Sequence, residues 1–251
     1  MAGWNDLSRE LDAWRAENRC ATFWWRDDDA VCQTAALGRL LDTSQDVGAP
    51  VALAVIPGEM NAELVGCLDE RDDIEVLQHG FKHINHAPPS AKASEFGPER
   101  DRHARLNELR KGRKLLSKFR RLLPVLVPPW NRIDESLLCF LPEIGIAGIS
   151  TFSARAASEN VPGLTRVNTH VDIINWRNGR KFLGIADTLE RAIDHLKARR
   201  LGSADPDEAT GLLTHHLVHD EQGWAFVADF LKLTGAHAGA KWIRAEEAFG
   251  F

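Results

Sequence analysis

The sequence predicts an α/β protein in which about seven parallel strands form a closed (β/α) barrel surrounded by helices. Short, continuously apolar runs alternate with amphipathic helical segments, the pattern of a parallel sheet covered on both faces. The chain has 251 residues, and no linker rich in Gly, Ser or Pro divides it. We therefore expect one domain over residues 1–251, with an open doubly wound sheet as the alternative.

Helices are expected where apolar residues recur at helical spacing. The first such segment repeats Leu7, Leu11 and Trp14 among acids and arginines. The second ends at Gly48, a residue type that commonly terminates helices. The expected helices cover residues 5–18, 34–48, 61–70, 99–121, 134–145, 187–202 and 223–235.

Strands are expected at the short apolar runs between these helices. The run ATFWW (21–25) is β-branched and aromatic and is too short for a helix. The next run, residues 50–57, is continuously apolar and ends at Pro57. A less readable segment around residues 165–176 is expected to hold a further strand. The other expected strands cover residues 50–57, 74–78, 124–129, 146–151 and 210–216.

The charge balance argues against nucleic acid or an anionic membrane as a partner. Asp and Glu number 36 against 31 Lys and Arg. One segment, residues 99–121, is locally basic, with ten Lys or Arg against three acids. It also carries an apolar side through Leu106, Leu109, Leu116 and Phe119. We therefore interpret it as a solvated outer helix rather than a nucleic-acid-binding surface.

The cysteines and the N-terminal residues favour a cytoplasmic protein. The four cysteines are scattered and form no Cys-x-x-Cys pair, which is typical of reduced thiols rather than of a zinc ribbon or a disulfide framework. The N-terminal residues show no basic start followed by an apolar stretch, so no secretory signal is expected. No apolar run approaches membrane-spanning length.

Polar side chains follow several of the predicted strands at the point where each strand ends. Because the carboxyl ends of parallel strands meet at one edge of the fold, these side chains should share one rim. Taken singly, each group would be a solvated loop, a helix cap or a core residue, and their recurrence favours a site. The segments are RDDD (26–29), HGFKH (79–83), WNR (130–132), HVDIINW (170–176) and HHLVHD (215–220).

The residue types on this rim are those of a hydrolytic metal site. Two imidazoles four residues apart can bind one ion, and a carboxylate is a common third ligand. The ion lowers the pKa of a bound water and polarises a carbonyl oxygen. A second carboxylate can act as general base and a distant histidine as general acid.

At these residues the chain resembles the polysaccharide deacetylases of carbohydrate esterase family four. The resemblance extends from about residue 21 to residue 220 and implies a distorted (β/α) barrel with fewer than eight strands. The first motif of that family is an aspartate pair, a base followed by a metal ligand. Divergent members often carry an arginine two positions before the pair, so Arg26 favours Asp28 as the base and Asp29 as the ligand. The other register makes them Asp27 and Asp28.

The second and third motifs of the family match unequally. HGFKH matches the His-x-x-x-His motif, so the resemblance implies that His79 and His83 are metal ligands. The third motif usually supplies an arginine that orients the base, but Val127 stands ahead of the prolines in VPPWNRI. Arg26 or Arg132 would have to replace it. Trp130 and Asn131 of this segment are candidates for substrate binding.

The fourth and fifth motifs imply a general acid and its surroundings. VDIINW retains Asp172 and Trp176, with Trp176 as a wall for the substrate. LLTHH resembles the late strand end that carries the acid, so His215 is the candidate and His216 the competing choice. Asp172 is expected to orient His215 from behind. Arg26, Asp27, Asp172 and His216 are thus expected to support the site rather than to react.

The resemblance implies a metal-dependent hydrolase that removes an acetyl group from an N-acetylated sugar or a related carbohydrate amide. The expected cofactor is one divalent ion, with Zn²⁺ preferred and Co²⁺, Ni²⁺ or Mn²⁺ as alternatives. The expected partner is a small or oligomeric acetylated carbohydrate. Two alternatives remain open: a non-catalytic metal- and carbohydrate-binding protein, and a hydrolase of a non-sugar C–N bond.

Overall fold

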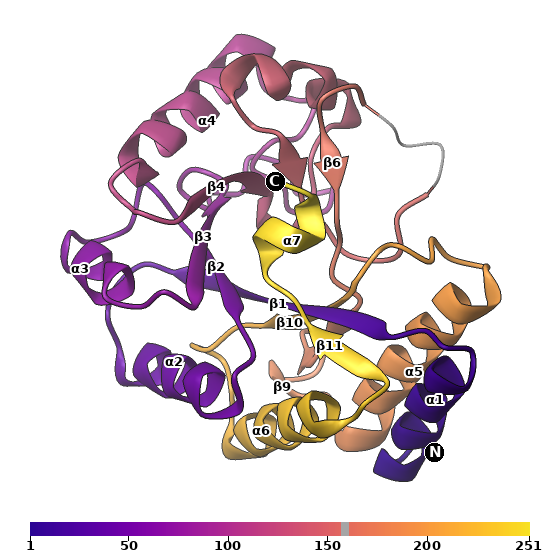
Figure 1. The fold of residues 1–251 in the computed structure, drawn as a ribbon. Helices are drawn as coiled ribbons and strands as arrows, with labels where there is room; N and C mark the ends of the chain where they lie inside the picture. Colours follow the sequence, from indigo (N-terminus) through magenta and orange to yellow (C-terminus); the bar gives the residue numbers. More distant parts are fainter. Residues whose placement is uncertain (157–160) are drawn as a thin grey trace.

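The protein is built around a parallel sheet that curls into a barrel (Figure 1). The computed structural model describes residues 1–156 and 161–251. Within these residues the strands follow the order β6-β5-β4-β3-β2-β1-β10-β7, and β11 pairs with the first half of β1. The strands are β1 (Ala21–Ala30), β2 (Val51–Val55), β3 (Ile74–His79), β4 (Leu122–Val127), β5 (Gly148–Ile149), β6 (Thr165–Arg166), β7 (Val171–Asp172), β10 (Thr210–Thr214) and β11 (Ala240–Trp242).

A single segment closes the barrel, because the two ends of the sheet, β6 and β7, are separated by only four residues of chain. The N–H of Val167 donates to the carbonyl of Ile149 on one side at 3.1 Å. The N–H of His170 donates to the carbonyl of Gly211 on the other side at 2.8 Å. Counted once, this segment and six further strands make the predicted distorted barrel, and the open-sheet alternative is excluded.

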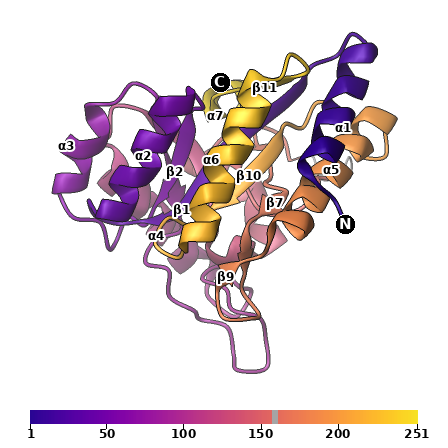
Figure 2. The ribbon, with the colours of Figure 1, turned by 90° about the horizontal axis from the view of Figure 1, so that it is seen from below.

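Helices surround the sheet, and the local sequence explains where they begin and end (Figures 1 and 2). The hydroxyl of Thr34 accepts the N–H of Leu37 at the start of α2, and Gly48 ends that helix in the left-handed conformation. Asp101 and Asp220 cap α4 and α6 in the same way as Thr34. The helices are α1 (Trp4–Ala16), α2 (Ala35–Val47), α3 (Glu63–Asp69), α4 (Arg102–Leu116), α5 (Ile185–Leu201), α6 (Glu221–Ala236) and α7 (Ala245–Phe249).

Several elements differ from the sequence-based expectation. The helix expected over 134–145 consists of short 3₁₀ turns, η2 (Glu135–Phe140) and η3 (Pro142–Ile144), because Pro142 lacks the N–H that an α-helix needs there. A further turn, η1, covers Pro129–Asn131. The small hairpin of β8 (Ile174–Asn175) and β9 (Lys181–Phe182), as well as β11 and α7, were not expected.

Side chains that alternate along β1 point into two different layers of the core. Phe23 and Trp25 belong to the apolar cluster that lies under the helices, whereas Trp24 belongs to the cluster that contains Leu77 of β3. Trp24 meets Phe249 of α7 edge-on at a centroid distance of 5.8 Å. This packing fills the barrel from the amino ends of its strands, so space for a ligand is left at the carboxyl ends. None of the helices described is sufficiently long and apolar to span a bilayer.

Candidate metal centre and active site

A cavity of about 1030 Å³ opens at the carboxyl ends of the strands. Its lining comes from all the segments that the sequence placed on one rim, so the predicted convergence is present in the structure. The sequence-predicted site residues that line it are Asp28, Asp29, His79, His83, Trp130, Asn131, Asp172, Trp176 and His215. Arg26, Asp27 and His216 lie behind this lining and are buried.

An irregularity at the end of β1 decides which aspartates face the cavity. The pairing of β1 with β2 shifts register between Asp28 and Ala30, and Asp29 has a φ of 74°. In a regular strand neighbouring side chains point to opposite faces. Here the bulge turns Asp29 so that it lines the cavity together with Asp28, while Asp27 points away and is fully buried. This arrangement supports the register in which Asp28 and Asp29 form the pair.

Asp29, His79 and His83 form a group whose ligand atoms all lie within 4.8 Å of one another. The Nε2 atoms of His79 and His83 lie 3.1 and 3.5 Å from Oδ1 of Asp29. Nδ1 of His79 lies 2.9 Å from the carbonyl oxygen of Val127, which only accepts, so Nδ1 carries a proton. In the neutral ring Nε2 then presents a lone pair to a carboxylate oxygen, and either a proton or a metal cation between the two atoms satisfies this contact.

Asp29 and the two histidines also act on one another electrostatically. Burial alone would raise the pKa of Asp29 and lower that of His79, but the attraction between the two groups outweighs it. The pKa of Asp29 is therefore lowered and that of His79 raised. Burial, together with the charge of His79, lowers the pKa of His83. A carboxylate, two imidazoles and an open cavity fit a divalent metal ion with a free coordination position.

A buried glutamate holds the loop that carries the second histidine. The carboxylate of Glu95 accepts the N–H groups of Phe81 and Lys82 at 3.0 and 2.8 Å. Gly80 has a φ of 56°, and a Cβ there would lie 2.1 Å from Oε2 of Glu95. This close approach explains why glycine stands at this position. The bend brings His83 against Trp130, with ring centroids 4.3 Å apart.

Arg26 is the arginine that contacts the candidate base Asp28. Its Nε and Nη2 donate to the two carboxylate oxygens of Asp28 at 2.9 and 3.0 Å. The guanidinium is 0% exposed and also donates to Ser150 Oγ and Asn131 Oδ1, both at 2.7 Å. Arg132 is instead exposed and donates to the carbonyl of Ala93. Between the two arginines that the sequence allowed, the geometry selects Arg26.

The two adjacent histidines after β10 have different surroundings. His216 is buried, and its Nδ1–H donates to Oδ1 of Asp27 at 2.5 Å. Burial would lower the pKa of His216 and raise that of Asp27, but their mutual attraction shifts both the other way. His215 lines the cavity, with Nε2 at 3.9 Å from Oδ2 of Asp28. The position of His215 is therefore the one suited to proton transfer, and His216 supports the end of β10.

Asp172 supports the cavity wall rather than His215. Its Oδ2 accepts the indole N–H of Trp176 at 2.7 Å, and its Oδ1 accepts the N–H of Ile174 at 2.9 Å. Burial raises the pKa of this carboxyl. Among the described residues His215 makes no hydrogen bond to Asp172, and its Nδ1 is buried without a partner. The ring of His215 instead meets Trp176 edge-on at 4.6 Å.

A second cluster, His170, His195 and Glu208, also brings potential ligand atoms together. Nδ1 of His170 accepts the N–H of Gly211 at 2.9 Å, so in the neutral ring Nε2 carries the proton. That nitrogen faces Oε2 of Glu208 at 3.4 Å, and the His170 and His195 rings stack at 3.4 Å. The proton occupies the nitrogen that a metal would need, so this cluster is the weaker metal candidate.

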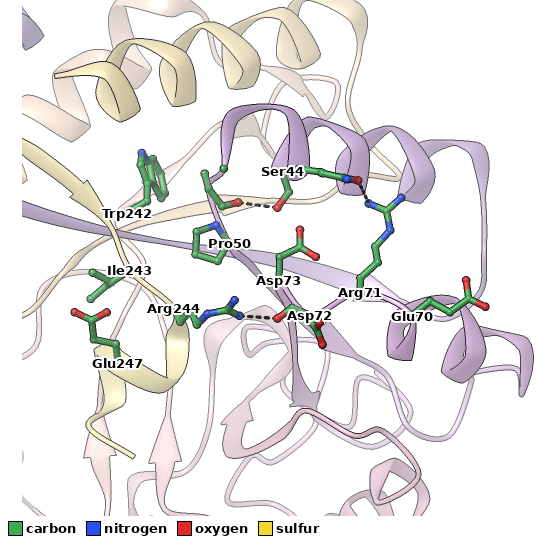
Figure 3. A pocket seen from close by; sticks show the side chains of 13 residues that line it. Ser44, Pro50, Glu70, Arg71, Asp72, Asp73, Trp242, Ile243, Arg244 and Glu247 are labelled. Carbon is green, nitrogen blue, oxygen red and sulfur yellow. Dashed lines mark hydrogen bonds between the residues drawn. The ribbon is translucent and has the colours of Figure 1, made fainter.

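A second cavity, of about 800 Å³, lies at the opposite end of the barrel (Figure 3). Pro50 and Asp73, which line it, directly precede β2 and β3. Arg244 donates to the carbonyl of Asp72 at 2.9 Å. Active sites of parallel barrels lie at the carboxyl ends of the strands. This position therefore argues against a catalytic role for the second cavity.

Some residues in and around the cavity were not anticipated from the sequence. Glu95 lies in a segment without periodicity, and nothing in its neighbourhood signals that it holds the HGFKH loop. Four basic residues of the cavity wall were also missed, because they are scattered through loops and one helix: Lys92, Arg177, Arg180 and Arg191. His86, the third histidine of the 79–86 stretch, is exposed and lies outside the metal group.

No family model and no curated protein sequence matches this chain. A candidate polysaccharide deacetylase from Mycobacterium smegmatis has a similar structure, with a TM-score of 0.61 and 13% identity over 92% of this chain and 89% of that one. A family 4 carbohydrate esterase from Streptomyces lividans, in complex with acetate, has a TM-score of 0.55 and 14% identity over 88% of this chain and 90% of that one.

A third similar structure is a mutant, with restored enzymatic activity, of a pseudoenzyme of the same esterase family. It has a TM-score of 0.57 and 13% identity over 92% of this chain and 68% of that one. At these identities the similarity shows a shared fold. The resemblance to polysaccharide deacetylases is therefore confirmed at the level of the fold.

Proposed function

We propose that this chain, which has the polysaccharide deacetylase fold, is a divergent metal-dependent deacetylase of carbohydrate esterase family four. It would hydrolyse the acetamide of an N-acetylated sugar or a related carbohydrate amide. One observation carries the proposal: the group of potential metal ligands Asp29, His79 and His83 lies in the same cavity as Asp28 and His215. Metal ligand, base and acid candidates thus converge on one site.

The metal ligands in this proposal are Asp29, His79 and His83, and Zn²⁺ is the ion that fits this donor set first. When bound, such an ion lowers the pKa of a water molecule and polarises a carbonyl oxygen. The hydrogen bond from His79 Nδ1 to Val127 fixes the orientation of the ring. Co²⁺, Ni²⁺ and Mn²⁺ are accommodated by the same ligands.

The acid and base roles are assigned to Asp28 and His215, two neighbouring side chains that both line the cavity. Asp28 takes a proton from the attacking water, and Arg26 holds the Asp28 carboxylate in place by the two-pronged contact. His215 gives a proton to the leaving amine, since its Nε2 lies near Asp28 and opens to the cavity. Trp130 and Trp176 provide apolar walls for the sugar ring or the acetyl methyl group.

Metal analysis together with turnover tests the proposal. We expect about one divalent ion per chain in the wild type and loss of the ion in His83→Ala. We expect acetate release from N-acetylated sugars by the metal-loaded wild type, and none by Asp28→Asn, which should keep its metal. Full activity of Asp28→Asn would show that the base is a different group.

A non-catalytic role is the second candidate, because one similar structure derives from a pseudoenzyme. In that case the protein would bind metal and sugar without releasing acetate. Stoichiometric metal in the wild type, combined with no turnover of any acetylated sugar or small amide, would favour this role.

A further inference from the structure

We infer that the ligand of the metal cavity carries an anionic group, a phosphate or a carboxylate, beside the acetylated part. As a statement about a substrate, this inference rests on the proposed function. It starts from five basic side chains that line the same cavity as the metal group: Lys92, Arg132, Arg177, Arg180 and Arg191.

The five side chains come from four different segments that line the cavity. Lys92 and Arg132 belong to the segments that follow β3 and β4. Arg177 and Arg180 belong to the β8–β9 hairpin, and Arg191 lies on α5. The hairpin and the long loop after β3 project from the same end of the barrel (Figure 2). A ligand on the metal would therefore share its cavity with basic groups from several segments of the chain.

These basic groups are not neutralised within the cavity. Arg132 and Arg191 donate to the carbonyl oxygens of Ala93 and Asp172 at 3.0 Å, which are uncharged acceptors. Among residues 1–156 and 161–251, none of the five basic side chains forms an ion pair with a carboxylate. Arginines elsewhere are often paired, for example Arg100 with Glu108 and Arg200 with Glu10.

The carboxylates that line the cavity are already engaged. Asp28 is paired with Arg26, Asp29 faces the two histidines, and Asp172 accepts two N–H groups. The outer part of the cavity therefore has an excess of positive charge, although the whole chain has a net charge of −5. Gathering like charges is unfavourable unless an anion compensates them, and the planar guanidinium fits carboxylate and phosphate oxygens with two parallel hydrogen bonds.

The hairpin places this charge next to the proposed sugar wall. Arg177 directly follows Trp176, whose indole is fixed by Asp172. Arg180 follows Gly179 in the turn, and both have positive φ, 51° and 78°. Arg177 and Arg180 are therefore the pair to test, because an anionic substituent of a ring held against Trp176 would come within their reach.

The test compares three probes that share the acetamide: N-acetylglucosamine, N-acetylglucosamine 1-phosphate and N-acetylglucosaminuronic acid. The first is neutral, and the other two distinguish phosphate from carboxylate. We expect kcat/KM to be at least about tenfold higher for one of the charged sugars, the size of a charge-assisted hydrogen bond. In the double variant Arg177→Gln/Arg180→Gln, kcat/KM for the charged sugar divided by kcat/KM for the neutral sugar should fall to about one.

A binding measurement separates this inference from the proposed function. The metal-loaded Asp28→Asn protein is titrated calorimetrically with the same three sugars, with and without the two arginine substitutions. The expected result is a Kd for a charged sugar that weakens about tenfold in the arginine variant and also weakens with added salt. Arg110→Gln/Lys111→Gln, on the exposed side of α4, is the control that should change nothing.

The outcomes are distinguishable. Charged sugars that bind through the arginines without any acetate release would sustain the inference and remove the deacetylase proposal. Turnover that is equal for neutral and charged sugars would sustain the deacetylase and overturn the inference. Binding of the phosphate sugar that is unchanged by the arginine substitutions would place the phosphate on the metal and also overturn it.

Discussion

Replacing Arg26 by glutamine should destabilise the protein and remove most of its activity at the same time. Arg26 is 0% exposed and binds both oxygens of Asp28, which is 2% exposed. The substitution would leave a buried carboxylate without its partner. Breaking such a pair costs about 3–5 kcal/mol, a large part of the roughly 5–15 kcal/mol that stabilises a typical domain.

Urea unfolding of matched variants measures this effect. The control is Arg39→Gln, because Arg39 also binds both oxygens of a carboxylate, that of Glu221, at 2.7 and 2.9 Å, but on the exposed surface. Solvent screens that pair, so its loss should have little effect on the midpoint. Arg26→Lys keeps the charge but not the two-pronged contact, so its midpoint should lie between those of wild type and Arg26→Gln.

The activity assay separates the role of Arg26 from general unfolding. Under conditions in which Arg26→Lys is folded, its metal content should equal that of the wild type, because Asp29, His79 and His83 are untouched. Its kcat should fall about 100-fold, the contribution of a positioned general base. If Arg26→Gln unfolded at the urea concentration of Arg39→Gln and kept wild-type kcat, the assignment of Arg26 as the residue that orients the base would be wrong.

Three further predictions concern other parts of the site. Gly80→Ala should lower the free energy of unfolding by roughly 1–3 kcal/mol and weaken metal binding, because the backbone is left-handed there and a Cβ would collide with Glu95. Unfolding curves and a metal titration measure the two effects. Gly66→Ala, at an exposed position of α3, is the control. His216→Gln should destabilise the fold, because Asp27 would be buried without its charged partner. His215→Gln should unfold like the wild type but lose turnover, because His215 lines the cavity. Equal stability of the two variants would contradict this assignment. For the metal-free protein, the free energy of unfolding should decrease as the pH falls from about 6.5 toward 4. Burial lowers the folded-state pKa of His195 to about 2 and of His219 to about 4, so the unfolded chain binds more protons in this range. Urea unfolding at several pH values should show a shallower slope for His195→Gln, and an unchanged slope would speak against the buried neutral imidazole.

Much of the fold follows from short-range patterns in the chain. ATFWW and the apolar run of β2 are strands because they are short, β-branched or small, and buried on both faces. Thr34 and Gly48 mark the ends of α2 by local hydrogen bonding and backbone conformation. The spacing of HGFKH and the polar residues behind successive strands placed the candidate metal ligands and the acid–base candidates on one rim, since parallel strands share their carboxyl ends.

Other features depend on contacts between distant parts of the chain. The segment around residues 165–176, which was expected to hold one strand, instead forms two-residue strands β6 and β7, because β5 and β10 offer unpaired edges on either side of it. The 3₁₀ turns at residues 135–144 and the C-terminal helix that meets Trp24 likewise became evident only in the structure.

The sequence by itself determined the inventory of the site: three aspartates, two histidines four residues apart, and a late histidine pair. Tertiary structure decided which of them face the cavity. A bulge in β1, where it pairs with β2, turns Asp29 toward His79. Asp27 points the other way and forms a hydrogen bond with His216. Arg26 reaches Asp28 from the same strand, although sequence alone left Arg132 as a rival. The physical reason is that side-chain direction at a strand end depends on the neighbouring strand, and no local pattern encodes that neighbour.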